Sequence, residues 1–211
     1  MWVLITGLIF SYLFGAVPTA YMFGKVLKDI DIREHGSGNV GATNVFRVMG
    51  KGAGTAVLLL DIFKGFFVVA IFAELMGLVD IWQRILLAVM VVIGHNYTLF
   101  LKFKGGKGVA TSLGVLLGLM VKIASLRGVV LITILVFVGC FLITRIISIS
   151  SILAAIVLPI TMAVTAQPFE LVLLGIIFSL FVVFRHRANI QRLLAGQEPK
   201  VPLKFGPSKK S

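Results

Sequence analysis

The run from residue 147 to residue 165, ISISSILAAIVLPITMAVT, decides the fold class, because it has no charged side chain and can cross ~30 Å of hydrocarbon as a helix. Comparable apolar runs precede and follow it along most of the chain. Hydrophobic residues make up 59% of the 211 residues, charged residues only 13%, and the mean hydropathy is +1.08. This composition excludes a soluble globular domain and predicts an all-α polytopic membrane protein.

Seven transmembrane helices are expected. They cover residues 2–23, 53–76, 85–101, 109–121, 129–143, 147–165 and 171–184. The fourth and fifth are short and could instead form one tilted, interrupted unit. A cleaved signal peptide fits residues 1–23 poorly, because no basic segment precedes the apolar run and Lys25 and Lys28 follow it.

The charges between the spans orient the chain. On the seven-span arrangement, 16 Lys and Arg residues collect on one side of the membrane and three on the other. The positive-inside rule then predicts an N-terminus outside the cell and a C-terminus in the cytoplasm. The loops 25–52 and 102–111 share the cytoplasmic side with the basic tail 188–211. We expect a membrane domain over residues 1–187 whose site these loops form and the tail completes.

Two loops are rich in glycine, GSGNVGATN at 36–44 and KFKGGKG at 102–108. The first matches the dinucleotide fingerprint, but Arg33-Glu34-His35 precedes it where a buried strand is required, so we reject that interpretation. Glycines allow consecutive backbone N–H groups to converge on an anion, and a helix beginning near Val109 would add its dipole. A flexible hinge is the alternative for the second loop.

Polar side chains in and near these loops can hold phosphate or hydroxyl oxygens. The candidate substrate-binding residues are Asn39, Gly41, Asn44, Lys104, Gly105, Gly106, Lys107, Gly108, Ser148 and Arg192. Ser37 can also donate a hydrogen bond, and Arg47 can clamp a phosphate with two. The alternatives are turn formation for Asn44, lipid headgroup contact for Arg47, and a bond to its own helix for Ser148.

His186 stands where the last span meets water, between Arg185 and Arg187. The two cations should lower its pKa and favour a neutral imidazole, which can accept a proton. Asn189 and Arg192 follow three and six residues later, so a continued helix would place all three on one face.

Other ionisable residues are assigned structural roles. Asp61 and Lys64 lie three apart within a span and can neutralise each other. Glu198 should pair with Arg192 or Arg187 and fix the tail over the site. Because His and acidic residues do not cluster, no metal site or cofactor is predicted. The basic residues alternate with spans, which excludes a nucleic-acid stripe, and those at the end of the tail should attract anionic membrane lipid.

The motifs, in sequence order, are GSGNVGATN (36–44), DIFKG (61–65), Gly94-His95, FKGGKGVAT (103–111), Arg185-His186, NIQR (189–192) and Glu198. Together they resemble the PlsY family, the bacterial acyl-phosphate:glycerol-3-phosphate acyltransferases, over essentially the whole chain. One departure is Thr98, where the family resemblance implies proline; it affects the turn after His95.

The resemblance implies transfer of a long-chain acyl group from acyl phosphate to the 1-hydroxyl of glycerol 3-phosphate. The products would be lysophosphatidic acid and inorganic phosphate, in phospholipid biosynthesis at the bacterial cytoplasmic (inner) membrane. An acyl-phosphate-forming enzyme would supply the donor. The other class of glycerol-phosphate acyltransferase uses His followed five residues later by Asp, and no histidine here has that partner.

The expected catalytic residues are His186, Asn189, Ser37 and Arg47. His186, oriented by Asn189, is the first choice of base, although a substrate phosphate could take the proton instead. A channel or carrier for a phosphorylated metabolite is the alternative function. It would call for polar residues at the midplane of several spans, and only the pair Asp61 and Lys64 fits.

Overall fold

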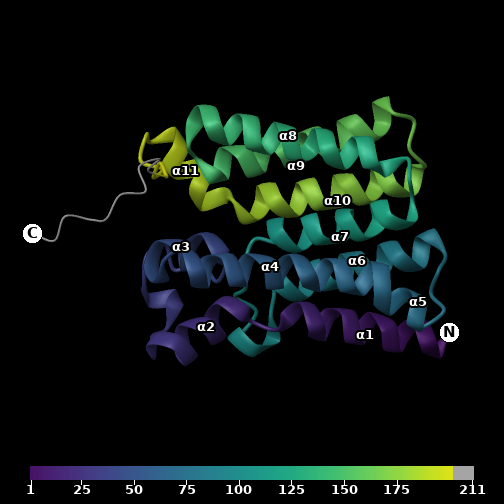
Figure 1. Ribbon diagram of the computed structural model, residues 1–211, viewed down its shortest axis with the longest axis horizontal. Helices are drawn as coiled ribbons and strands as arrows, with labels where there is room; N and C mark the ends of the chain where they lie inside the picture. Colours follow the sequence, from purple (N-terminus) through teal and green to yellow (C-terminus); the bar gives the residue numbers. More distant parts are fainter. Residues whose placement is uncertain (202–211) are drawn as a thin grey trace, which may run out of the picture.

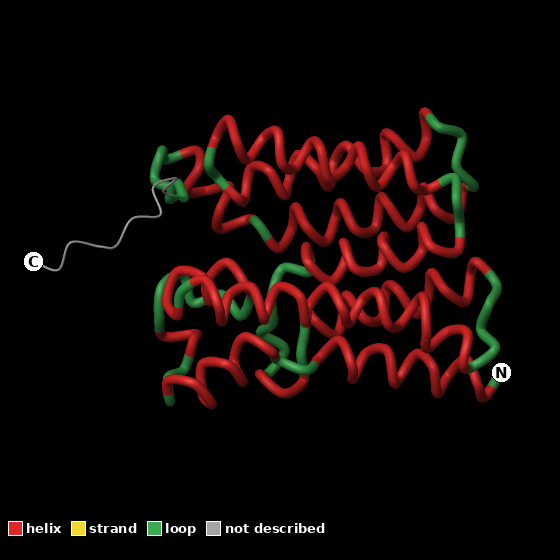
Figure 2. Tube along the Cα trace, in the orientation of Figure 1, coloured by secondary structure: helices red, strands yellow, loops and turns green. Residues whose placement is uncertain are grey.

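The computed structural model describes residues 1–201, and these form helices and connecting loops without a strand (Figures 1 and 2). Helices are expected in such a chain because they satisfy every backbone polar group internally in lipid. The elements are α1 (Trp2–Ala16), α2 (Thr19–Lys28), the 3-10 turn η1 (Ile32–Glu34), α3 (Ala42–Met49), α4 (Lys51–Phe67), the π-helical turn η2 (Val68–Phe72), α5 (Ala73–Leu75), α6 (Ile81–Asn96), the 3-10 turn η3 (Leu99–Leu101), α7 (Val109–Lys122), α8 (Leu126–Thr144), α9 (Ile147–Val164), α10 (Phe169–Arg185) and α11 (Arg187–Leu194).

Each of the seven predicted spans contains a helix. Five helical stretches are long and apolar enough to cross a membrane, or six if α10 and α11, which meet at a 58° bend, count as one. At ~1.5 Å per residue, the 14 residues of α7 are too few to cross a bilayer alone. Figure 1 shows α7 and α8 as separate helices joined by a turn, so they do not form one interrupted unit.

The first predicted span is broken near Pro18, which the sequence-based span 2–23 did not anticipate. Proline lacks the N–H that would continue the hydrogen-bond ladder, so α1 ends at Ala16 and α2 begins at Thr19. Two side chains cap the carbonyls at the break. Thr98 Oγ1 donates to the Ala16 carbonyl at 2.5 Å, and Lys64 Nζ donates to the Val17 carbonyl at 2.6 Å.

Glycines allow the helices to pack closely. A side chain at Gly15 of α1 would collide with the backbone of α6, and one at Gly114 of α7 would collide with the backbone of α4. A second layer, α8 to α10, packs against this one, and many apolar side chains of α8 face outward, as a lipid environment requires. In Figure 1, α2, α3 and α11 lie at the end of the bundle away from the N-terminus. The loop before α7 contacts both neighbouring parts, because Lys107 donates to Asn189 of α11 and Gly105 and Gly106 line a small cavity together with Val40.

Candidate active site

The glycine loop 36–44 is fastened by one of its own side chains. Asn44, at the start of α3, is almost fully buried, and its Oδ1 accepts from the Ser37 N–H at 2.8 Å. Its Nδ2 donates to the carbonyls of Ile32 at 3.1 Å and His35 at 2.9 Å. The amide is thus occupied within the loop, which favours the turn-forming role over substrate binding.

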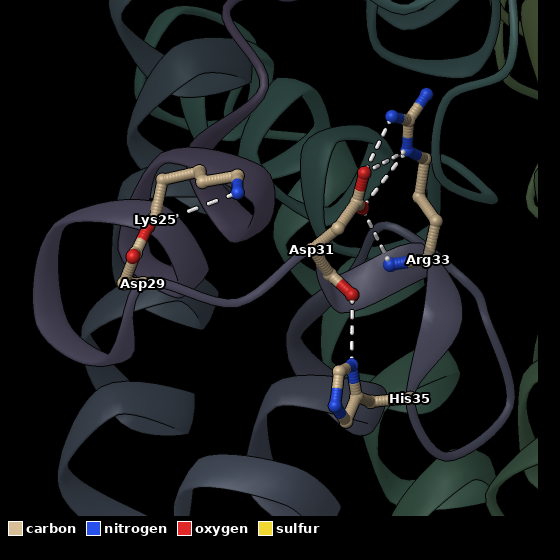
Figure 3. A network of polar contacts seen from close by, with 5 residues as sticks. All are labelled: Lys25, Asp29, Asp31, Arg33 and His35. Atoms are coloured by element: carbon tan, nitrogen blue, oxygen red, sulfur yellow. Dashed lines mark hydrogen bonds and ion pairs between the residues drawn. The ribbon is translucent and has the colours of Figure 1, made fainter.

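The stem of this loop is held by a second set of polar contacts (Figure 3). Asp31 accepts from the backbone N–H of Arg33 at 3.0 Å and from its guanidinium at 2.6 Å. The side-chain hydrogen bond from Arg33 is the main reason that the pKa of Asp31 falls to about 2. His35 Nδ1 donates to the Asp31 carbonyl at 2.9 Å, and Lys25 lies 3.8 Å from Asp29 beside them. The stem is therefore fixed independently of any substrate.

The second glycine loop is docked on the end of α6. The N–H groups of Gly105 and Gly106 donate to the carbonyls of Asn96 at 3.2 Å and His95 at 3.0 Å. Arg185 in turn donates to the carbonyls of Gly105 at 2.8 Å and Gly106 at 3.0 Å. The N–H groups predicted to form an anion nest at these two glycines are consequently occupied. For these two residues the nest prediction is wrong.

Free donors begin one step later, where the loop becomes helix α7. Gly108 has a φ of +78°, a left-handed conformation that glycine adopts without strain, and it ends the loop. Within residues 1–201, no group accepts from the N–H groups of Val109, Ala110 and Thr111. The first N–H groups of a helix lack intrahelical partners and carry the positive end of its dipole. An anion can bind at this helix end.

Lys107 links this helix end to the tail through one hydrogen-bond network. Its Nζ donates to Asn189 Oδ1, and Asn189 Nδ2 donates to Glu198 Oε1. Ser148 Oγ also donates to Glu198 Oε1, at 2.8 Å, and Arg192 Nε donates to Glu198 Oε2 at 2.7 Å. The predicted pairing of Glu198 with Arg192 is confirmed, and it joins α9, α11 and the tail.

The electrostatics of this network favour an incoming anion. Burial lowers the pKa of Lys107 to about 8, and the positive charges of Arg192, Arg185 and Arg47 add to the effect although Glu198 opposes it. Burial raises the pKa of Glu198, but hydrogen bonds from Asn189 and other donors outweigh it, so the net shift is downward. Several cations thus surround a single carboxylate that is already paired.

His186 follows span α10 at the bend before α11, and its side chain is buried. Its Nδ1 lies 2.7 Å from the Val182 carbonyl, which can only accept, so Nδ1 carries the proton and Nε2 keeps a lone pair. Burial is the largest cause that lowers the pKa of His186, to about 4, and the positive charge of Lys107 is the second. The charge of the neighbouring Arg185 lowers this pKa less than burial does. Asn189 is bonded to Lys107 and Glu198, so the prediction that it orients His186 is wrong; Val182 does so.

Other predicted residues lie at the surface of the protein. Ser37, Lys104 and Arg47 are exposed, and Arg47 is close enough to Lys107 to affect its pKa. Asn39 lies against Gly41, where its Nδ2 would be 2.9 Å from an added Cβ.

The family described as glycerol-3-phosphate acyltransferase matches residues 5–196. The glycerol-3-phosphate acyltransferase of Gloeobacter violaceus is 43% identical over 197 residues, 90% of this chain and 91% of that protein. The chain belongs to the glycerol-3-phosphate acyltransferase family. The acyltransferase of the same name from Synechocystis is 46% identical, with coverage of 92% of this chain and 89% of that protein.

The glycerol-3-phosphate acyltransferase family also includes solved structures. A crystal structure of PlsY, an integral membrane glycerol 3-phosphate acyltransferase, in its glycerol 3-phosphate form matches with a TM-score of 0.85 and 38% identity. The alignment covers 94% of this chain and 96% of that one. The lysophosphatidic acid form of PlsY matches with a TM-score of 0.82. The protein therefore has the fold of an integral-membrane acyltransferase.

The sequence did not identify Arg185 as a site residue of this acyltransferase family member. Its guanidinium holds the glycine loop and lies 5.2 Å from the centroid of the Tyr97 ring. The only sequence signal for Arg185 was its position next to His186. Its partner, the Gly106 carbonyl, lies 79 residues away along the chain, and residue spacing cannot predict such a contact. Within residues 1–201, no three His, Cys, Asp or Glu side chains gather as metal ligands would.

Proposed function

We propose that this chain transfers a long-chain acyl group from an acyl phosphate to the 1-hydroxyl of glycerol 3-phosphate. Lysophosphatidic acid and inorganic phosphate are the products. The observation that carries the proposal is the surplus of cations around Lys107, where Glu198 is already paired with Arg192. Two phosphate-bearing substrates repel each other, and only compensating cations and N–H groups make their joint binding favourable.

The phosphate of the acyl donor binds at the start of α7. The N–H groups of Val109, Ala110 and Thr111 have no acceptor within residues 1–201 and are available to a phosphate, and the Lys107 ammonium supplies the charge. Gly105 and Gly106 contribute by holding the loop rather than by binding phosphate.

The second phosphate, that of glycerol 3-phosphate, binds at the exposed rim. Arg47 and Lys104 provide its charge there, and the Ser37 hydroxyl and the Asn39 amide provide hydrogen bonds. Arg192 and Ser148 act through Glu198, which fixes Asn189 and hence Lys107.

The reaction needs one new bond and one proton acceptor. The 1-hydroxyl oxygen attacks the acyl carbonyl carbon, the bond from that carbon to the phosphate oxygen breaks, and phosphate leaves with the electron pair. His186 Nε2 accepts the hydroxyl proton because Nδ1 is already bonded to Val182. Phosphate is a good leaving group, so positioning and charge stabilisation supply much of the remaining rate.

The charges between the spans and the apolar helix faces support a membrane setting for this reaction. The N-terminus lies outside the bacterial inner membrane and the tail lies in the cytoplasm. The acyl chain lies between spans in contact with membrane lipid. A separate enzyme forms the acyl phosphate, and no cofactor takes part.

Purified protein with synthetic acyl phosphate tests the function. Phosphate release should require glycerol 3-phosphate, and acyl-CoA should not replace the acyl phosphate. Release that is independent of glycerol 3-phosphate would contradict acyl transfer. Uptake of glycerol 3-phosphate into proteoliposomes without any acyl product would instead support a carrier.

A further inference from the structure

A buried charged cluster lies beneath the glycine loop 102–108, and the reaction described above does not use it. Asp61 and Lys64 of α4 and His95 of α6 are 1%, 4% and 8% exposed. Lys64 Nζ lies 2.8 Å from Asp61 Oδ1, which confirms the predicted pair, and His95 Nδ1 lies 3.7 Å from the same oxygen. Charges buried this deeply cost free energy unless their geometry is well defined.

The cluster also holds the break in the first span. Thr19 Oγ1 donates to Asp61 Oδ1 at 2.6 Å, and Lys64 Nζ donates to the Val17 carbonyl. Lys64 thereby satisfies a carbonyl near the break at Pro18. These two contacts fix the position of α4 relative to the junction between α1 and α2.

His95 transmits this fixed position to the loop by two contacts. Its carbonyl accepts from the Gly106 N–H at 3.0 Å. Its ring fills the space next to Gly106, where an added Cβ would collide with Nε2. A cavity of about 10 Å³ lies at the same point and is lined by Thr19, His95, Thr98 and both glycines, among others. The loop therefore rests on the His95 ring, with little free space beneath it.

We propose that Asp61, Lys64 and His95 are positioning residues for the phosphate-binding loop. Lys64 and Thr19 fix the Asp61 carboxylate, which lies 3.7 Å from His95 Nδ1 and so sets the place of the ring. The ring backs Gly106, and Gly106 sets the position of Lys107 and of the start of α7. The inference rests on the proposed phosphate site. It goes further by assigning a role in substrate binding to a charge pair that would otherwise serve stability alone.

The first experiment separates positioning from stability. His95→Gln should raise the KM for acyl phosphate by about 10-fold or more, because misplacement of binding groups by ~1 Å can cost up to ~10²-fold. The melting temperature in detergent and the yield should stay near those of the unsubstituted protein. Glu74→Gln is the matched control, because Glu74 lies 2.6 Å from the buried Arg84 in another ion pair, away from the loop. It should lower the melting temperature and leave KM unchanged.

A double-mutant cycle tests the coupling through His95. Asp61→Asn should raise KM in the unsubstituted protein but have little further effect in the His95→Gln background, because residues of one contact network are not additive. If Asp61→Asn alone does not fold, the neutral pair Asp61→Asn with Lys64→Met replaces it. Additive effects on KM would overturn the proposal, and so would a fall in melting temperature with KM unchanged.

A readout without turnover separates this inference from the proposed function. A nitroxide at Lys102→Cys, in a chain whose single cysteine is removed by Cys140→Ser, reports the mobility of the loop by electron paramagnetic resonance. His95→Gln should make the label more mobile, and Glu74→Gln should not. An inactive but otherwise folded protein that showed this response would overturn the proposed function and retain the positioning role. An unchanged spectrum would overturn the positioning role.

Discussion

The two glycine loops have similar composition but are built differently. Loop 36–44 uses glycine for backbone conformation, with φ values of +63° at Gly36 and +69° at Gly38, and is fastened from within by Asn44. Loop 102–108 uses Gly105 and Gly106 for close approach to α6 and is fastened from outside by Arg185. Glycine density therefore does not by itself identify a phosphate nest. In the proposed function, the second loop binds phosphate through Lys107 and the start of α7.

The largest effect is expected at His186, which belongs to neither loop and supplies the proposed base. General-base catalysis contributes about 10²–10⁴-fold, so His186→Ala should lower kcat by that factor. His186→Gln is the matched variant, because glutamine donates a hydrogen bond but is not a base. Because the pKa of the ring is lowered to about 4, kcat/KM should fall only as the pH drops through that value. A near-normal kcat in the glutamine variant would contradict His186 as the base and would indicate that a substrate phosphate accepts the proton.

The two loops should differ in their response to loss of charge. Lys107→Met should raise the KM for acyl phosphate by about 10- to 100-fold, since a hydrogen bond to a charged group contributes about 1.5–3 kcal/mol. Arg47→Met and Lys104→Met, on the exposed rim, should have smaller effects, chiefly on the KM for glycerol 3-phosphate.

Lys102→Met removes the same charge from the second loop outside the network and serves as the control. Steady-state kinetics with each substrate varied in turn make the comparison. Unchanged KM values in the variants of Lys107, Arg47 and Lys104 would contradict the phosphate site.

A methyl group added to each loop tests the difference in construction. Gly106→Ala should collide with the His95 ring and cost about 1–3 kcal/mol, with loss of substrate binding. Gly41→Ala should be milder, because the added Cβ meets only the mobile end of the Asn39 side chain and the backbone there is extended. Melting temperatures and KM values of the two variants decide the point. Equal effects would mean that the loops are not built differently.

The smallest effect is a pH dependence confined to the second loop. Burial lowers the pKa of Lys107 to about 8, so the free enzyme loses this charge as the pH rises through that value. The KM for acyl phosphate should then increase above about pH 8, by less than Lys107→Met increases it. Lys107→Arg should remove the dependence, because arginine stays charged. A rise that persists in Lys107→Arg would assign the titration to another group.

The sequence predicted the helices and the residue pairs that depend on local spacing. Long apolar runs indicate helices directly, and Asp61 with Lys64 lies one helical turn apart. The pairing of Glu198 with Arg192 could also be predicted, because the two residues carry opposite charges and lie six residues apart. Spacing could not show that the Gly105 and Gly106 N–H groups are taken by α6, nor that Asn189 faces Lys107. Those contacts depend on how distant helices pack, and so does the role of Arg185.

The most direct test of acyl transfer is to follow the oxygen that bridges the acyl carbon and the phosphorus. Acyl phosphate labelled with ¹⁸O at that position is incubated with the purified protein and glycerol 3-phosphate, and both products are analysed by mass spectrometry. Attack at the acyl carbon predicts that all of the label leaves in inorganic phosphate and that lysophosphatidic acid forms in equal amount without label. Label retained in a carboxylic acid, with phosphate transferred to glycerol 3-phosphate, would contradict acyl transfer.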